Sequence, residues 1–257
     1  AVADAPAMHS SQNEQDSRIL ADFARVPCLE PADQQQAYDM TREAFDLSER
    51  FGLPVMVRLV TRLCHSRAVV LPAPPRAPNP LAKTAAPQDW TLLPHNARRL
   101  WRRLLDRLPE VREWAEASPH NRLTPGDPEA PFAVITSGIA RHYFTAESGD
   151  LGFRPSHLHV GAYPPPEGML VGLSGAAHRL LVIEEGYPFL EKRVRGVLPH
   201  PWEVAGRESG ALPLDGELTP ERVRAALGLP PRPHLAASAL PLPGRPPQLC
   251  RGCPHAD

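Results

Sequence analysis

The sequence is short of several things, and each shortage excludes a class of protein. Its 28 basic residues include only two lysines, Lys83 and Lys192, and 29 acidic residues bring the net charge to −1. A chain this close to neutral has no broad electrostatic attraction for nucleic acid or anionic lipid. No apolar run approaches the roughly 20 residues that span a bilayer. We therefore expect no nucleic-acid partner and no membrane partner.

Cysteine is scarce as well. Cys28, Cys64, Cys250 and Cys253 are too few for a disulfide scaffold in 257 residues, and no apolar signal core stands at the start of the given sequence. We therefore expect a reducing, cytoplasmic location. The sequence opens without methionine and stops just after a metal-like cysteine pair, which indicates an internal fragment of a longer protein.

What the sequence does contain is enough apolar residues for a core, 42% of the chain, and an excess of proline. The 33 prolines are roughly 13% of the residues, against a usual figure of about 5%. Proline is densest over residues 71–80 (LPAPPRAPNP), which predicts an extended linker. A helix is expected over about residues 96–118, and Pro109 should end or kink it. Arginines surround this helix, which favours a solvated face over contacts with phosphate.

Residues 1–67 have the pattern of an α/β unit. Asp33 followed by Gln36 predicts a helix start with a capping box. The apolar residues that follow recur at spacings of three and four and define one helical face: Ala37, Met40, Ala44, Leu47 and Phe51. Gly52 fits the helix end, and the run VMVRLVTRL over residues 55–63 predicts the next strand.

Residues 129–200 alternate between strand and helix patterns. Strands are expected at residues 132–137, 157–163 and 179–183, each followed by a helix, and this order predicts a parallel sheet with right-handed crossovers. Residues 201–248 have a linker-like composition with one short helix at about 220–227, for which Thr219 is the expected N-cap.

Two polar segments could carry chemistry. Residues 9–16 (HSSQNEQD) are eight consecutive polar residues after the tail of a strand, and they fit either a ligand-binding loop or a solvent-exposed one. Cys250 and Cys253 have the spacing that holds one edge of a tetrahedral metal site or a cubane cluster. One pair supplies only half of the ligands, so two reduced surface cysteines remain the alternative.

Three strand ends also carry polar residues. Residues 61–67 and the paired carboxylates Glu184 and Glu185 follow predicted strands, where ligands gather in α/β sheets. For Glu184 and Glu185 we favour a solvated strand end. Thr136-Ser137-Gly138 opens a turn into a helix and could place backbone N–H groups around an anion.

Four blocks of sequence, in order, resemble the alpha subunits of indolepyruvate ferredoxin oxidoreductases, which belong to the 2-oxoacid:ferredoxin oxidoreductases. The first is MHSSQNEQDSR with LEPADQQQAYDMTREAFDLSERFGLPVMVRLVTRLCHSR. The second runs from LPHNARRLWRRL to EASPHNRL, the third joins FAVITSGIA to RLLVIEEGYPFLEKRVR, and the fourth joins DGELTPERVRAAL to PPQLCRGCPH. MHSSQNEQD is the most specific of these motifs.

The resemblance implies an α/β architecture: a partial thiamine-diphosphate-binding fold plus a transketolase C-terminal-like parallel βαβ domain, joined by Pro-rich linkers. Residues 1–67 would be the C-terminal half of the pyrimidine-binding domain. A Pro-rich linker and helix would occupy 68–128, the transketolase C-terminal-like domain 129–200, and a second linker 201–248. Residues 249–257 would begin the pyrophosphate-binding domain.

The resemblance also implies a reaction: oxidative decarboxylation of an aryl 2-oxoacid with coenzyme A, which gives aryl-acetyl-CoA, CO2 and reduced ferredoxin. Thiamine pyrophosphate, Mg2+ and a 4Fe–4S cluster would be the cofactors, and a beta subunit or fused beta-like domain and ferredoxin the partners. The family's activating Glu and its metal–diphosphate motif are absent from these residues. We therefore expect no catalytic residue within the chain and no turnover by the chain alone.

Within this family the polar loop becomes the expected contact with cofactor or substrate. Its cofactor-binding residues are expected to be His9, Ser11, Asn13, Gln15 and Arg18, with Arg18 neutralising a carboxylate. Cys250 and Cys253 are the expected metal ligands. The alternatives are a related enzyme acting on pyruvate or a branched-chain oxoacid, and a non-catalytic transketolase-C-like interaction module.

Overall fold

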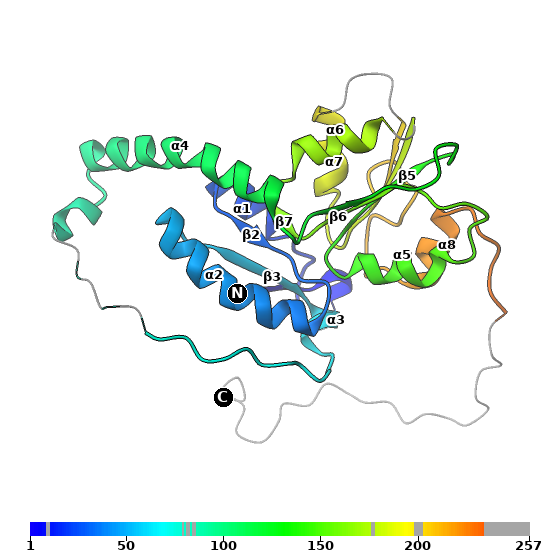
Figure 1. The fold of residues 1–257 in the computed structure, drawn as a ribbon, viewed down its shortest axis with the longest axis horizontal. Helices are drawn as coiled ribbons and strands as arrows, with labels where there is room; N and C mark the ends of the chain where they lie inside the picture. Colours follow the sequence, from blue (N-terminus) through cyan, green and yellow to red (C-terminus); the bar gives the residue numbers. More distant parts are fainter. Residues whose placement is uncertain are drawn as a thin grey trace.

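A computed structural model describes residues 1–8, 11–78, 80, 83, 86–175, 178–197 and 203–233. Within these ranges the chain forms two mixed α/β units, each built on its own sheet, and the long helix α4 (Pro94–Ala117) lies beside both (Figure 1). None of the helices in these ranges combines the length and the hydropathy that a membrane span requires.

The first sheet has the strand order β1-β3-β2-β7. Its strands are β1 (Val2–Asp4), β3 (Met56–Val60), β2 (Cys28–Leu29) and β7 (Ala162–Tyr163). β3 pairs in parallel with β1 and with β2, while β7 is antiparallel to β2. β3 stops at Val60, earlier than the sequence predicted, because Thr61–Cys64 turn into the short helix α3.

Helix α2 (Gln34–Phe51) covers this sheet, and the sequence predicted it closely. The Asp33 carboxylate accepts a hydrogen bond from the Gln36 N–H at 2.8 Å, and the Gln36 side chain accepts one from the Ala32 N–H. Gly52 ends the helix with φ +63°, a backbone conformation that glycine adopts without strain. The buried face consists of Met40, Ala44, Leu47 and Phe51.

The second sheet has the order β4-β6-β5-β8-β9. Its strands are β4 (Arg122–Thr124), β6 (His157–Val160), β5 (Ala133–Ser137), β8 (Arg179–Ile183) and β9 (Glu203–Ala205). The three central strands and β9 are parallel, as predicted for the central three, and β4 is antiparallel to β6. β9 lies in the stretch expected as a linker; three residues are too few to show a strand periodicity.

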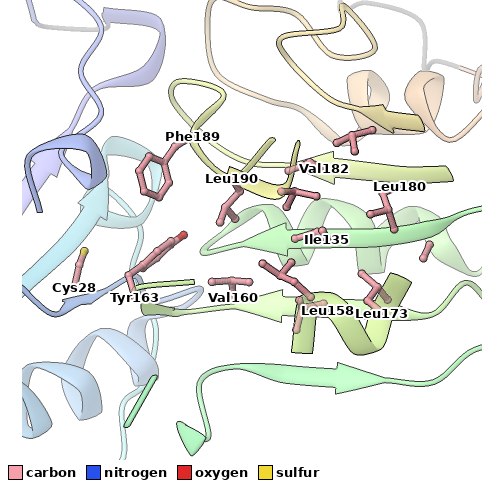
Figure 2. Packing of buried hydrophobic residues seen from close by; sticks show 14 of the residues in the cluster. Cys28, Ile135, Leu158, Val160, Tyr163, Leu173, Leu180, Val182, Phe189 and Leu190 are labelled. Atoms are coloured by element: carbon pink, nitrogen blue, oxygen red, sulfur yellow. The ribbon is translucent and has the colours of Figure 1, made fainter. Parts of the chain in front are cut away.

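Helices cover both faces of the second sheet. They are α5 (Ala140–Ser148), α6 (Glu167–Ser174), α7 (Phe189–Val197) and α8 (Pro220–Ala226). Thr219 caps α8 as predicted, because its hydroxyl accepts a hydrogen bond from the Arg222 N–H. Alternate residues of one strand separate to the two faces, so that Ile135 packs towards α6 and α7 while Val134 packs towards α5 and α8 (Figure 2).

Pro109 lies inside helix α4, so of the two expected effects of this proline, an end of the helix does not occur. Proline removes one backbone donor, but the residues after it, Val111, Trp114 and Ala115, are buried and hold the following turns against the first unit. The arginines of α4 are exposed, as the solvated-face interpretation predicted.

The carboxyl ends of the parallel strands of both sheets meet between the two units. β1 ends at Asp4, β5 ends at Ser137, and Glu30 and Glu184 directly follow β2 and β8. Tyr163 brings the chain from the second sheet back to the first through β7. This junction is the place where the topology gathers polar groups.

Candidate functional site

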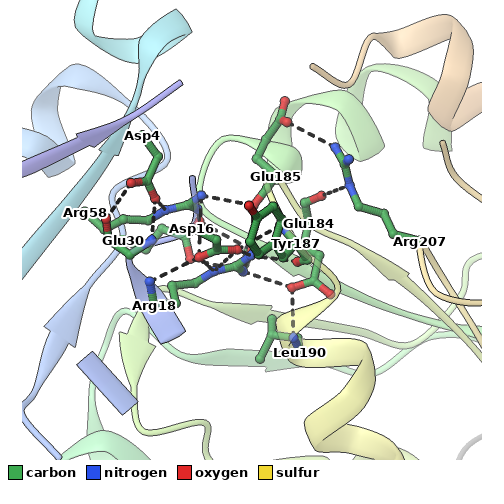
Figure 3. Close-up of polar contacts among 12 residues, drawn as sticks. Asp4, Asp16, Arg18, Glu30, Arg58, Glu184, Glu185, Tyr187, Leu190 and Arg207 are labelled. Carbon is green, nitrogen blue, oxygen red and sulfur yellow. Dashed lines mark hydrogen bonds and ion pairs between the residues drawn. The ribbon is translucent and has the colours of Figure 1, made fainter. Parts of the chain in front are cut away.

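A buried network of charged side chains occupies the junction between the two sheets (Figure 3). Each of its members is at most 6% exposed to solvent. The members are Asp4, Asp16, Arg18, Glu30, Arg58, Glu184, Glu185 and Arg207. Charges are stable in such a place only when each is paired and hydrogen-bonded, so the partners of every group matter.

Arg18, at the start of helix α1 (Arg18–Ala24), lies at the centre. Its Nη2 is 2.5 Å from Asp16 Oδ2, and its Nη1 is 2.9 Å from Glu184 Oε2. Nη1 also donates to the Ser137 hydroxyl at 3.2 Å, and Nη2 donates to the Glu185 carbonyl at 2.8 Å. One guanidinium thus connects α1 to the ends of β5 and β8.

Asp16 is the closest counter-ion of Arg18. Burial alone would raise the pKa of this carboxyl, but Arg18 and Arg58 outweigh burial and lower it to about 2. Its Oδ2 also accepts a hydrogen bond from the Tyr187 N–H at 2.9 Å. Asp16 therefore stays ionised at neutral pH and holds the end of the polar loop against the turn that follows β8.

Arg58, which lies within β3, is the second buried arginine that connects several segments of the network. Its Nε is 2.6 Å from Asp4 Oδ2, its Nη1 donates to Glu30, and its Nη2 donates to the Glu185 carbonyl at 3.1 Å. Glu30 accepts a second hydrogen bond from the Tyr163 hydroxyl. Arg58 therefore ties three strands of the first sheet to the second unit.

Glu184 and Glu185 both follow β8, and they face different partners. Glu184 accepts hydrogen bonds from the Leu190 and Glu191 N–H groups at the start of α7, at 2.9 and 3.1 Å. Burial raises its pKa, and the Arg18 charge opposes that rise. The positive end of α7 also favours a carboxylate at this position.

Glu185 is bound on the other side by Arg207, at 3.4 Å, and by the Leu218 N–H at 3.1 Å. Burial raises its pKa to about 7, against the lowering effect of Arg207. The interpretation of Glu184 and Glu185 as a solvated strand end is therefore wrong. They are 0% and 1% exposed, because the N-terminal segment and the loop before α8 cover this strand end.

Two glycines leave room for the network. A Cβ on Gly138, where φ is +46°, would lie 2.7 Å from Glu30 Oε1. A Cβ on Gly186, where φ is +90°, would lie 2.7 Å from Asp16 Oδ2 and 2.9 Å from Arg58 Nη2. The acidic group at the predicted anion-binding turn is therefore the protein's own Glu30.

Chemically, the charged groups of this network are bound to one another or to the backbone, although five carboxyl groups face only three arginines. Its arginines bind carboxylates and carbonyls of the protein, and its carboxylates bind arginines or backbone N–H groups. Of its charged members only Arg18 also lines a groove of about 730 Å3 beside α1. The arrangement is suited to holding two sheets and one loop in place, and it presents no uncommitted nucleophile.

The structure places the predicted site residues in different settings. Ser11, Asn13 and Gln15 lie on a surface loop, where Asn13 accepts hydrogen bonds from Ser11 at its backbone and from Gln15 at its side chain. Arg18 is buried in the network. His9, Cys250 and Cys253 lie outside the described residues.

Sequence reasoning missed half of the network: Asp4, Glu30, Arg58 and Arg207 were not singled out. The available signal was Arg58, an arginine within the apolar strand run VMVRLV. The predicted polar strand end at residues 61–67 is only partly engaged. Thr61 donates to the Asp4 carbonyl at 3.0 Å and Arg62 binds Glu217, while residues 64–67 are exposed.

The fold is similar to that of a solved enzyme. It matches the solved 2-oxoglutarate:ferredoxin oxidoreductase of Magnetococcus marinus, which was determined with 2-oxoglutarate, coenzyme A and succinyl-CoA bound. The TM-score is 0.54, over 86% of this chain and 43% of that one, and at 13% sequence identity the likeness shows the fold alone. The predicted α/β class with parallel sheets is confirmed. No family profile matches the chain.

Comparison with curated protein sequences gives more specific relatives than the fold does. Indolepyruvate oxidoreductase subunit IorA of Methanothermobacter thermautotrophicus is 37% identical over 262 residues, which cover 99% of this chain. The IorA subunit of Archaeoglobus fulgidus is 34% identical over 272 residues. Along its whole length the chain is similar to the IorA subunits of indolepyruvate oxidoreductases, as the sequence motifs indicated, and it spans 42% of the length of these relatives.

Proposed function

We propose that the chain is part of an oxidoreductase that converts an aryl 2-oxoacid, such as indolepyruvate, to aryl-acetyl-CoA. In this reaction the carboxyl group leaves as CO2, coenzyme A takes the acyl group, and two electrons reduce ferredoxin. The observation that carries the proposal is the 37% identity to an IorA subunit across 99% of the chain.

The proposal includes thiamine pyrophosphate, Mg2+ and a 4Fe–4S cluster, and the described residues do not fit these groups on their own. They contain no cluster of His, Cys, Asp and Glu that could hold a metal. The buried carboxylates of the junction already bind arginines or backbone N–H groups. We therefore assign the metal and cluster ligands to residues outside the described ranges, which leaves Cys250 and Cys253 as the proposed cluster ligands of this chain.

The contribution that we assign to the described residues is the placement of the polar loop. Asp4 accepts hydrogen bonds from the Ser17 N–H at 2.9 Å and from the Ser17 hydroxyl. Glu14 accepts from the Ala7 N–H at 2.7 Å. Both ends of the loop are thus anchored, while the side chains of Asn13 and Gln15 are exposed, available to a cofactor or substrate bound by an adjacent domain.

Asn13 tests this assignment. In the assembled enzyme, Asn13→Ala is expected to raise KM for the 2-oxoacid or the concentration of thiamine pyrophosphate needed for half-maximal activity, by about tenfold for one lost hydrogen bond. The unfolding midpoint should stay unchanged, because Asn13 is exposed. Gln88→Ala, an exposed amide on a distant short helix, is the control. Kinetics identical to those of the parent enzyme would remove the loop from the site.

The reaction itself is tested by anaerobic assay. The natural protein that contains these residues, purified with its companion subunit and thiamine pyrophosphate, is expected to reduce ferredoxin only when indolepyruvate and coenzyme A are both present. The 257-residue chain alone is expected to show no reduction. If the enzyme prefers pyruvate or a branched-chain oxoacid, it is a related enzyme with a different substrate. If no 2-oxoacid is turned over, the chain is better explained as part of a non-catalytic interaction module.

A further inference from the structure

Helix α1 presents an apolar face to solvent. Ile19, Leu20 and Phe23 are 43%, 62% and 86% exposed, while Arg18 and Ala21 on the other face are buried. A seven-residue helix with its large apolar side chains pointing outwards loses free energy in water that contact with another surface would recover. Because Arg18 is fixed by the network, this face is held rigidly in place.

Grooves flank α1 on both sides. The first, of about 730 Å3, lies between α1, α4 and the loop after β7, and Trp101 and Phe189 line it. The second, of about 490 Å3, includes Ile19, Tyr187 and Leu214. Both grooves share Asp22, Phe189 and Arg193, so the apolar surface continues across the helix. Large exposed apolar surfaces of this kind mark interaction sites.

The groove beside α4 carries surplus positive charge. Its single acidic residue, Asp22, is paired with Arg193. Arg25 lies over the Trp101 ring at 5.2 Å, and within the described ranges neither Arg25 nor Arg112 forms an ion pair. An occupant that complements this surface has an apolar centre and an acidic rim.

The charge pattern also excludes two occupants from this chain. The C-terminal segment, residues 234–257, carries Arg245 and Arg251 against the single acid Asp257. A second copy bound through the same face around a twofold axis would bring like arginines together. The projecting N-terminal half of α4 (Figure 1) extends the surface beyond the body, within reach of another polypeptide.

We propose that α1 and its two flanking grooves are the docking surface for the companion subunit of the enzyme, which contributes an acidic surface with an apolar centre. This inference rests on the proposed function only in that it assumes a companion subunit. Phe23 and Trp101 are the central apolar contacts, and Arg25 and Arg112 pair with acids at the rim.

Photo-crosslinking in the assembled enzyme tests this. With p-benzoylphenylalanine in place of Phe23, illumination is expected to crosslink the chain to an acidic segment of the companion subunit. The same replacement of Phe45, 72% exposed on α2, is expected to give no such product. Crosslinks from position 23 to a second copy, to another part of the same polypeptide, or to nothing would overturn the proposal.

Charge reversal gives a second readout that does not depend on turnover. Arg25→Glu is expected to raise the Kd of the companion subunit by about tenfold, and more at low salt. Arg67→Glu, at an exposed site after α3, is expected to leave it unchanged. An unchanged Kd for Arg25→Glu, or the absence of any complex between the two chains, contradicts the docking surface. A complex that forms normally yet turns over no 2-oxoacid contradicts the proposed reaction instead.

Discussion

Replacing Arg58 with methionine is expected to lower the free energy of unfolding by about 3–5 kcal/mol, the usual cost of leaving buried charges without their partner. Arg58 is 0% exposed and binds the Asp4 and Glu30 carboxylates together with the Glu185 carbonyl. Methionine fills a similar volume, so little of the loss comes from a cavity. What remains is the cost of two buried carboxyl groups that lose their hydrogen-bonding partner.

Urea denaturation followed by far-UV circular dichroism measures this change at pH 7. Arg50→Met is the matched control, because Arg50 forms its ion pair with Glu110 at the surface, where it is 53% exposed. Exposed pairs contribute roughly 0–1 kcal/mol. If the two variants lose stability to the same small extent, the network does not hold the sheets together, and the loop before α1 loses its proposed anchor.

The regular elements were predictable because their signals are local. The capping box at Asp33, the three–four spacing of Met40 and Ala44, and the end at Gly52 are all read within one helix. The strand at Arg179–Ile183 matches the predicted bounds for the same reason. Thr219 follows the same rule, since an N-cap needs only the next turn of its own helix.

The network was not predictable because its partners are remote in sequence. Arg18 donates to the carbonyl of a residue 167 positions away, and Arg58 donates to the same carbonyl across 127 positions. Taken alone, each polar residue looks like a surface group, which is how Glu184 and Glu185 were misinterpreted. Only the topology, with the ends of both parallel sheets at one junction, shows that these groups are buried together.

The polar loop of residues 9–16 shows what sequence composition alone does not predict. Its polar composition fitted either a ligand-binding loop or a solvent-exposed one. The structure shows that Glu14 and Asp16 are bound internally, while Asn13 and Gln15 are exposed. Composition cannot separate side chains that build a loop from side chains that the loop presents. That separation is why Asn13, rather than Arg18, is the sharper test of cofactor contact.

Acid is expected to destabilise the second unit through two histidines of β6: His159, which is buried, and His157, which is partly buried. Thr136 Oγ1 lies 2.8 Å from His157 Nε2 and 3.1 Å from His159 Nδ1, and His159 Nε2 has no partner among the described residues. Burial, with a smaller contribution from Arg141, lowers the pKa of His157 to about 4 and that of His159 to about 3. The unfolded chain therefore binds protons near pH 6.5 that the folded chain does not bind until far lower pH.

Stability consequently falls as the pH drops from 6.5 to 5, by about 1.5 kcal/mol for each of these rings. Glu185 acts in the opposite direction. Its pKa is raised to about 7, so the folded state binds a proton that the unfolded state does not, and stability rises by about 1.5 kcal/mol over the same interval. The parent chain is thus expected to lose only part of what the histidines alone would cost.

Comparison of variants separates the two effects. His159→Gln is expected to lower stability at pH 6.5, through lost packing, and to lose about 1.5 kcal/mol less than the parent between pH 6.5 and pH 5. His95→Gln, at an exposed position on α4, is the control and should follow the parent curve. Urea titrations at four pH values give the slopes. A His159→Gln curve parallel to that of the parent would mean that this ring is protonated in the folded state near its ordinary pKa, and that water reaches the interior beside β6.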